Sequence, residues 1–223
     1  MRAKAVLAAL ALAASACTSS IAAAEAVFDA PVAARQARES GMKTAIFAGG
    51  CFWGVEAVFS HTRGVTSAVS GYHGGTAGTA NYAQVSRGGT AHAEAVRVTY
   101  DPSVVRYDQL LQILFSVVAD PTLRNRQGPD VGSQYRAAIV PTSTEQRTVA
   151  RAYLAQMQRS GVWDKPIVVP VEAAQRFYPA ETYHQDFAHK NPDHGYIRRW
   201  DAPKVTAWRA KYPALYCSAF LTR

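Results

Sequence analysis

The sequence predicts an α+β domain, in which helices pack on a mixed sheet and a long irregular C-terminal tail wraps around both. Three observations point to this class. Apolar runs with strand-like and helix-like spacing alternate between residues 43 and 171. Some of these runs are separated by hairpin-length connections. After residue 172 the periodicity weakens, and prolines recur at positions 179, 192, 203 and 213.

The first 24 residues have the three parts of a secretory signal peptide. A basic head with Arg2 and Lys4 precedes an apolar run over residues 5–16, which is too short to span a bilayer permanently. Cleavage after residue 24 would release a soluble protein. Alternatively, the box Ala14-Ser15-Ala16-Cys17 resembles a bacterial lipoprotein site, with the lipid on Cys17. Either reading predicts an exported, periplasmic protein whose only route to the membrane is that lipid.

The elements of the first half follow from local pattern. Residues 25–41 are Ala-rich without a strong period, and we interpret them as a tether. The apolar run 43–48 ends at glycines and predicts a buried strand. A helix should begin directly after Cys51. Residues 65–72 predict another strand, followed by a Gly-, Thr-, Ser- and Asn-rich loop over 74–89.

The second half continues the alternation. Residues 94–100 alternate like a strand, and apolar residues at helical spacing predict a helix over 110–118. A polar loop leads to a strand over 135–140. Ser143 with Gln146 forms a capping-box pattern for the next helix. One more strand is predicted over 167–171, and the domain with its tail extends over residues 42–217.

Composition excludes several functions. The net charge is +8 at pH 7, but the basic residues are scattered with no run of five, so no nucleic-acid partner is expected. The histidines show no metal spacing and neither HExxH nor CxxC occurs, so no metal is expected. No stretch after residue 24 is long and apolar enough for a membrane span. Nothing suggests an oligomer, so a monomer is expected.

Cys51 is the main candidate for chemistry. It lies at a strand-to-helix turn, where unpaired backbone N–H groups favour an anion and commonly lower a thiol pKa. The flanking glycines allow a sharp turn and close approach of a substrate. The alternatives are an inert buried thiol between Phe52 and Trp53, or a structural disulfide with Cys217.

Glu94 is the second candidate. Strand parity places it on the same face as Val96 and Val98. On an apolar face a carboxyl loses solvation, which raises its pKa and lets it serve as a general acid. The alternative is a frayed strand end, with Glu94 in water.

Other side chains could line a site around Cys51. The rings of Phe52 and Trp53 would form an apolar seat for a small group such as a methyl, although core packing is the alternative for either ring. Tyr82 lies in the Gly-rich loop. The polar loop before the 135–140 strand contains Asp130 and ends at Tyr135. Each tyrosine could equally be amphipathic surface cover.

Several ordered motifs resemble peptide methionine sulfoxide reductases of type A. The resemblance covers about residues 43–216, and a lone CFWG would not establish it. The motifs are Gly50-Cys51-Phe52-Trp53-Gly54-Val55-Glu56, Gly71-Tyr72-His73-Gly74-Gly75, Asn81-Tyr82, His92-Ala93-Glu94, Asn125-Arg126-Gln127-Gly128, Asp130-Val131-Gly132-Ser133-Gln134-Tyr135-Arg136 and Glu181-Thr182-Tyr183-His184-Gln185. Ala91, Ala119 and Pro129 depart from the family pattern, and Pro129 could alter the direction of Asp130.

The resemblance implies a ferredoxin-like α/β plait and reduction of the S epimer of methionine sulfoxide, free or in oxidised proteins. It implies Cys51 as nucleophile and Glu94 as acid. It further implies that Phe52 and Trp53 hold the S-methyl, and that three residues bind the sulfoxide oxygen, namely Tyr82, Asp130 and Tyr135. No bound cofactor is implied.

The chemistry would convert Cys51 to a sulfenic acid, and a second thiol would then condense with it. Cys217 is the resident candidate for a transient disulfide. A thioredoxin-like protein, or dithiothreitol in vitro, would then reduce it.

Two other functions fit the same residues. A Cys–His hydrolase acting on cell-wall material would pair Cys51 with His92 or His184. A non-enzymatic exported module would use its two remaining cysteines as a staple.

Overall fold

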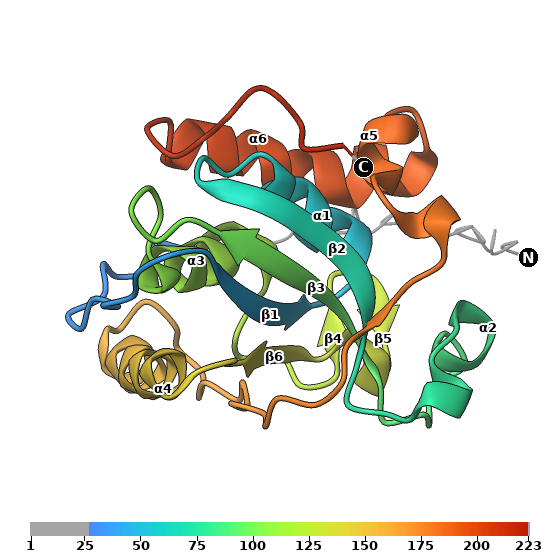
Figure 1. Ribbon diagram of the computed structural model, residues 1–223, viewed down its shortest axis with the longest axis horizontal. Coiled ribbons are helices and arrows are strands. Elements are labelled where there is room, and N and C mark those ends of the chain that lie inside the picture. The colour runs from blue at the N-terminus through green and yellow to red at the C-terminus, as the bar shows by residue number, and fades with distance from the viewer. Residues whose placement is uncertain (1–26, 223) are drawn as a thin grey trace, which may run out of the picture.

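The computed structural model describes residues 27–222, whose centre is a five-stranded sheet of order β6-β1-β3-β2-β7 (Figure 1). The strands are β1 Lys43–Gly49, β2 Val65–His73, β3 Ala93–Tyr100, β6 Ala137–Val140 and β7 Tyr178–Pro179. A separate hairpin pairs β4, Arg126–Gln127, with β5, Asp130–Val131. The predicted α+β class is confirmed.

The sheet itself is antiparallel rather than mixed. Each ladder between the named strands of residues 27–222 runs antiparallel. The strand predicted over 167–171 is wrong, because that segment meets β6 only through an isolated parallel bridge from Val171 to Ile139. Pro166 and Pro170 explain this, since proline has no N–H to donate to a ladder.

The chain follows a βαββαβ path through β1, α1, β2, β3, α3 and β6, with β1 and β3 central. This is the split βαβ arrangement of a ferredoxin-like plait. The helices are α1 Phe52–Ser60, α2 Tyr82–Val85, α3 Tyr107–Ile113, α4 Thr144–Arg159, α5 Phe187–Lys190 and α6 Ala202–Lys211. The predicted helix over 110–118 begins at Tyr107 and continues as a π-helix over Leu114–Val118.

Strand alternation divides the buried residues between the two faces of the sheet. Phe47, Val96 and Val98 belong to the large core cluster, together with residues of α1, α3 and α4. Ile46 and Ala95 belong to a smaller cluster on the other face, which the extended chain around residue 177 covers. The larger face therefore supports α1, and α1 carries the residues around Cys51.

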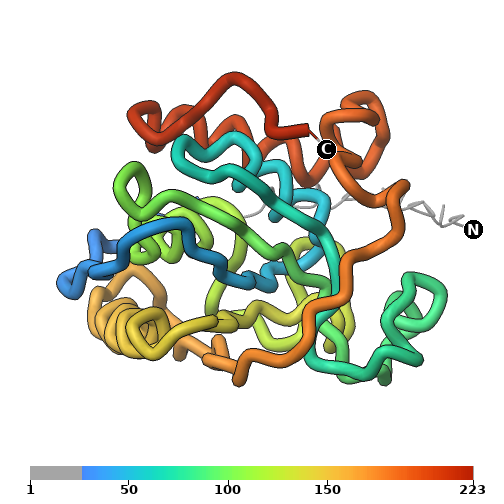
Figure 2. Tube along the Cα trace, in the orientation of Figure 1, coloured from blue at the N-terminus to red at the C-terminus, as the bar shows by residue number. Residues whose placement is uncertain are grey.

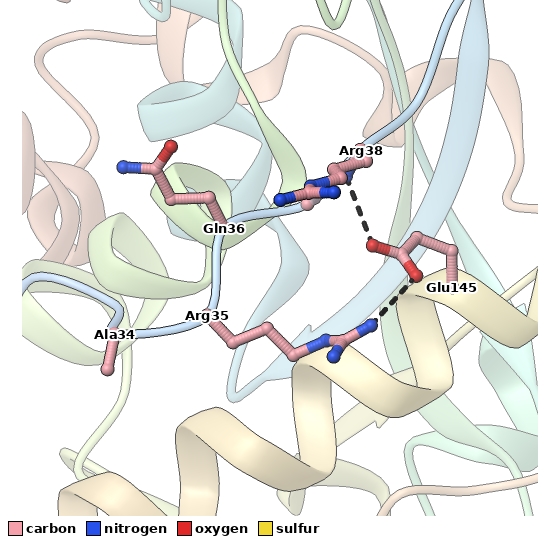
Figure 3. Close-up of a pocket in the computed structure, with 6 residues that line it drawn as sticks. Ala34, Arg35, Gln36, Arg38 and Glu145 are labelled. Atoms are coloured by element: carbon pink, nitrogen blue, oxygen red, sulfur yellow. Dashed lines mark hydrogen bonds and ion pairs between the residues drawn. The ribbon is translucent and has the colours of Figure 1, made fainter.

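The described part of the 25–41 segment packs on the domain. Its backbone bonds to helical side chains, with Ala34 N–H donating to Gln156 Oε1 at 2.8 Å and Ala37 N–H to Asp108 Oδ1 at 2.8 Å. Figure 3 shows Arg35 and the backbone of Arg38 both directed at Glu145 of α4. These contacts hold the segment against α3 and α4, so over residues 27–41 it is more than a tether.

The C-terminal tail returns over α1. Figure 2 shows α6 and the last described residues running along the same side of the molecule as α1. Two more segments of this tail are helical, a 3-10 turn η4 at Thr182–His184 and a π-helix η5 at Ile197–Asp201. Residues 182–201 contact the start of α1, whereas residues 215–221 contact its end.

No helix among residues 27–222 is long and apolar enough to cross a membrane. The predicted signal peptide, both cleavage sites and Cys17 lie outside the described residues.

Candidate active site

Cys51 is the N-cap residue of α1, and it follows Gly50 and Gly49, the last residue of β1. Gly50 has φ of 90°, and a Cβ there would lie 2.6 Å from the Cβ of Gln127. Glycine therefore permits both the turn and the close approach of the β4–β5 hairpin. Gln127 is buried and exchanges two hydrogen bonds with the Asp120 backbone, which fixes the hairpin beside Cys51.

Glu94 lies beside that turn, as strand parity predicted. Its side chain is 2% exposed, and its Oε2 accepts a hydrogen bond of 3.0 Å from the Phe52 backbone N–H. Burial raises the pKa of Glu94 to about 8, the Phe52 N–H opposes the shift, and the charges of Asp130 and Asp201 add to it. At neutral pH Glu94 is therefore a protonated carboxyl next to the candidate nucleophile.

Cys51 differs from the prediction in one respect. The pKa of its thiol is raised well above the ordinary value, chiefly by burial and then by the charge of Glu94. The helix start was expected to lower the pKa, but a backbone hydrogen bond from Trp53 only partly opposes burial. Since its pKa is raised, the resting Cys51 sulfur is a thiol at neutral pH. Glu94 is neutral below about pH 8, so in that range it carries no charge that would oppose formation of the thiolate.

Phe52 and Trp53 occupy different environments. Phe52 is 1% exposed and packs 4.9 Å from the His184 ring and 5.9 Å from the Tyr72 ring, as a core residue does. Trp53 is partly exposed and stacks on Phe187 at 3.8 Å between ring centroids. Its indole Nε1 donates to His184 Nδ1 at 3.0 Å. Trp53 is therefore the ring with a surface open to a substrate.

The structure brings the three predicted oxygen-binding residues to this place. Tyr82 begins α2, and its ring lies 4.5 Å from that of His184. Tyr135 ends the 3-10 turn η3, Ser133–Tyr135, which contacts the strand β3 that carries Glu94. Burial raises the pKa of Tyr135, and the charges of Glu94, Asp130 and Cys51 raise it further. Asp130 accepts a hydrogen bond from the Tyr196 hydroxyl, and burial raises its pKa.

Sequence reasoning did not find the tail residues of the site. Tyr196 holds Asp130, His184 orients Trp53, and Glu181 accepts hydrogen bonds from the Tyr72 hydroxyl at 2.8 Å and the Tyr82 N–H at 2.9 Å. Glu181 belongs to a motif noted without a role for it, and the sequence offered His184 only as a partner of Cys51 in a hydrolase. Tyr196 carries no local signal, because the tail around it has no clear period.

The histidines proposed for a Cys–His hydrolase are otherwise engaged. His92 Nδ1 accepts from the Gly75 N–H at 3.1 Å, and His92 Nε2 is 3.0 Å from the Thr76 carbonyl oxygen. Both ring nitrogens therefore bind the glycine-rich loop. His184 Nδ1 accepts the Trp53 indole N–H. In each ring the nitrogen that could accept a proton already accepts a hydrogen bond, so neither imidazole is free to serve as the base for Cys51.

Cys217 lies at the other end of α1 from Cys51. Its N–H donates to the carbonyl of His61, the C-cap residue of α1, at 2.7 Å, and its own carbonyl oxygen is 2.9 Å from His61 Nδ1. With 1.5 Å of rise per helical residue, roughly 15 Å of α1 separates His61 from Cys51. Both cysteines are free thiols. A disulfide requires Cα atoms within about 7 Å, so this structure contains no staple.

Within the part of the chain that the structure describes, no three His, Cys, Asp or Glu side chains are grouped to hold a metal ion.

Comparison with known proteins places this geometry in a family. A family model described as peptide methionine sulfoxide reductase matches residues 43–214. The chain is 52% identical over 172 residues to a Synechocystis sp. protein named peptide methionine sulfoxide reductase MsrA 2, covering 77% of this chain and 80% of that protein. A Mesorhizobium japonicum protein of the same name is 51% identical over 176 residues, covering 79% and 90%.

Solved structures of such enzymes share the fold. Reduced Mxr1 from Saccharomyces cerevisiae superposes with a TM-score of 0.63 at 30% identity, covering 70% of this chain and 90% of that one. Methionine sulfoxide reductase A of Corynebacterium diphtheriae gives a TM-score of 0.55 at 33% identity, covering 69% and 77%.

Proposed function

Because this chain belongs to the peptide methionine sulfoxide reductase family and is an enzyme of that activity, we propose that Cys51 and Glu94 reduce the S epimer of methionine sulfoxide between them. The observation that carries this proposal is the Phe52 N–H bond to Glu94, which holds a proton-bearing carboxyl next to residue 51. The substrates are free methionine sulfoxide and oxidised methionines in proteins.

The chemistry follows from these two groups. The Cys51 thiol loses its proton to solvent, and the thiolate forms a bond to the sulfoxide sulfur while Glu94 donates its proton to the sulfoxide oxygen. The sulfur–oxygen bond of the substrate and the new sulfur–sulfur bond then break as the oxygen, with the proton from Glu94, passes to Cys51 as a sulfenic acid. Methionine leaves, reduced by the two electrons that Cys51 has lost. Proton donation of this kind contributes about 10²–10⁴ in rate.

The surrounding side chains stabilise charge and position the substrate. The hydroxyls of Tyr82 and Tyr135 donate hydrogen bonds to the developing oxyanion, and the Asp130 carboxylate, which can only accept, contributes through a bridging water. Trp53, which is partly exposed and stacks on Phe187, contacts the S-methyl group of the substrate. Phe52 packs beneath this pocket as part of the core.

Replacing the nucleophile tests the first step. Cys51→Ser should form no methionine from methionine sulfoxide with dithiothreitol as reductant, while Cys217→Ser should still form one methionine per enzyme without any reductant. Full activity of Cys51→Ser would contradict the mechanism. Circular dichroism of both variants checks that the fold is kept.

Recycling of the sulfenic acid depends on the tail. We propose that Cys217 leaves His61, approaches Cys51 and forms a disulfide, which a thioredoxin-like protein then reduces. Since roughly 15 Å of helix separates the two ends of α1, residues 212–221 must rearrange for this step. The position of Cys217 also favours a second route, in which an external thiol reduces the sulfenic acid directly.

Multiple turnover by Cys217→Ser distinguishes the two routes. Loss of turnover with a thioredoxin-like reductant, with the first methionine still formed, supports the disulfide route. Unchanged turnover assigns recycling to the external thiol.

We also propose that the enzyme is exported to the periplasm as a monomer, either soluble or anchored by a lipid on Cys17. The three-part pattern of residues 1–24 supports export. Mass spectrometry of the mature N-terminus from cells separates the two forms, and an intact Met1 would contradict export.

A further inference from the structure

A buried cation lies beneath the Cys51 turn. Lys204 is in the first turn of α6 and is only 4% exposed, and its Nζ lies 3.8 Å from Asp201 Oδ1. Burying an ammonium group is costly unless carboxylates compensate it. Such a buried charge calls for a role.

Asp201 and Lys204 both pack against the catalytic turn. An ideal Cβ at Gly54, in the first turn of α1, would lie 2.2 Å from Asp201 Oδ1 and 3.4 Å from Lys204 Cδ. Asp201 is completely buried, and its charge raises the pKa values of both Cys51 and Glu94. An uncompensated Asp201 would therefore oppose the thiolate that the reaction needs.

Lys204 also acts on Asp130 across the site. Asp130 bonds the hydroxyl of Tyr196, the N-cap residue of the η5 helix that ends at Asp201. Burial raises the pKa of Asp130 overall, and the hydrogen bond from Tyr196 and the charge of Lys204 both oppose that rise. The charged and titratable groups on the elements packed against α6 include Cys51 and the buried Glu56 of α1, with Glu94 beside the start of that helix, and Tyr196, Arg199 and Asp201 around η5, with Asp130 bound to Tyr196.

We propose that Lys204 is a positioning residue of the reaction: its buried ammonium keeps Asp130 and Asp201 ionised, so that Tyr196 stays bound to Asp130 and the proton of the cluster stays on Glu94. The proposal rests on the mechanism above, in which Glu94 is the acid. Without Lys204, the carboxyls of Asp130 and Asp201 would compete with Glu94 for its proton. The sign follows from electrostatics, because removing a cation raises the pKa of every neighbouring acid.

The test is the pH dependence of single-turnover methionine formation by full-length enzyme without reductant. Lys204→Met should displace the acidic limb upward by about one pH unit and slow the reaction several-fold at pH 6. Lys204→Arg, which keeps the charge, should restore the limb. Lys211→Met is the matched control, because Lys211 is a cation of the same helix that pairs with exposed Asp29. Its profile should equal that of the wild type.

A wild-type pH profile in Lys204→Met, whatever its melting temperature, would overturn the proposal, as would a Lys204→Arg profile displaced like that of Lys204→Met. If Lys204→Met does not fold, the double variant Asp201→Asn with Lys204→Met removes both buried charges. Its acidic limb should still be displaced because Asp130 has lost its cation, and a wild-type limb there also overturns the proposal. Cys51→Ser retains Lys204, so full activity of that variant would contradict the mechanism itself, independently of the result for Lys204.

Discussion

At the scale of single residues, Glu94 is suited to the proposed role of acid because of where its strand places it. Its carboxyl is buried on the core face of β3 and keeps its proton up to about pH 8, against an ordinary pKa of 4.5. The folded chain therefore binds more protons than the unfolded chain between these two pH values. Stability must fall as pH rises through that window. The same burial that makes Glu94 an acid thus makes it a cost to the fold.

Glu94→Gln should separate these two effects. The variant keeps an acceptor for the Phe52 N–H but has no proton to give, so methionine formation should fall about 10²–10⁴-fold. Its stability relative to wild type should be unchanged near pH 4.5 and rise to on the order of 3 kcal/mol by pH 7. Urea unfolding at several pH values measures the second effect. A difference independent of pH would show that Glu94 is charged in the fold.

Glu172→Gln is the matched control with the opposite sign. Burial raises the pKa of Glu172, but hydrogen bonds and charges from His73 and Arg136 outweigh it and lower the pKa to about 2. Its stabilisation is present above pH 4.5 and is lost as pH falls toward 2. The variant should therefore be less stable than wild type at pH 7 and approach it in acid, with activity retained.

The wild-type enzyme should also lose activity with an apparent pKa near 8 on the alkaline side, because Glu94 then gives up the proton it donates. Single-turnover methionine formation between pH 6 and 10 measures this limb. The limb should be absent from the residual activity of Glu94→Gln.

At the scale of elements, the start of α1 depends on how closely the tail packs on it. Gly54 is a helical residue whose position could accept alanine on propensity alone. The Asp201 carboxylate leaves no room for a methyl group there. Gly54 is therefore required by the close packing of η5 and α6 against the first turn of α1. A larger residue at position 54 would displace the tail, and the tail in turn excludes a larger residue there.

Gly54→Ala should lower stability by about 1–3 kcal/mol through overpacking, and it should reduce activity because α1 carries Cys51. Gly78→Ala is the matched control, since a Cβ at Gly78 meets nothing within 4 Å. Thermal unfolding and methionine formation measure both variants. Equal melting temperatures and activities of the two variants would mean that Asp201 and Lys204 can move aside for a methyl group at position 54 at little cost.

At the scale of the whole molecule, two parts of the C-terminal tail contact the two ends of α1. Residues 182–201 complete the site beside Cys51, whereas Cys217 is held at His61. Phe220 packs 5.2 Å from the His61 ring and 4.6 Å from the His189 ring, which closes this second contact. The resting structure therefore separates the proposed nucleophile, Cys51, from the proposed resolving thiol, Cys217.

Phe220→Ala should weaken that contact and speed formation of the Cys51–Cys217 disulfide several-fold after one turnover, with the first methionine formed at the wild-type rate. Peptide mapping under non-reducing conditions at timed intervals follows the disulfide. If wild type and variant both form none, Cys217 does not resolve the sulfenic acid.

The local sequence pattern was sufficient to predict much of the fold, because strands, turns and helix starts depend on residues that are close together in the chain. Periodicity located β1, β2, β3, β6 and α1, and parity placed Glu94 on the buried face. Ser143 caps α4 as its motif indicated, although the Gln146 side chain bonds the Thr142 N–H instead of closing the box.

Contacts between distant segments decided the rest. They joined Asp130 to Tyr196, set Lys204 and Asp201 under Gly54, and placed Cys217 at the far end of α1. They also reversed the expected pKa shift of Cys51, because burial outweighs the backbone groups of a helix start. Burial and charge are sums over everything that surrounds an atom, and much of what surrounds these residues comes from chain positions more than 40 residues away.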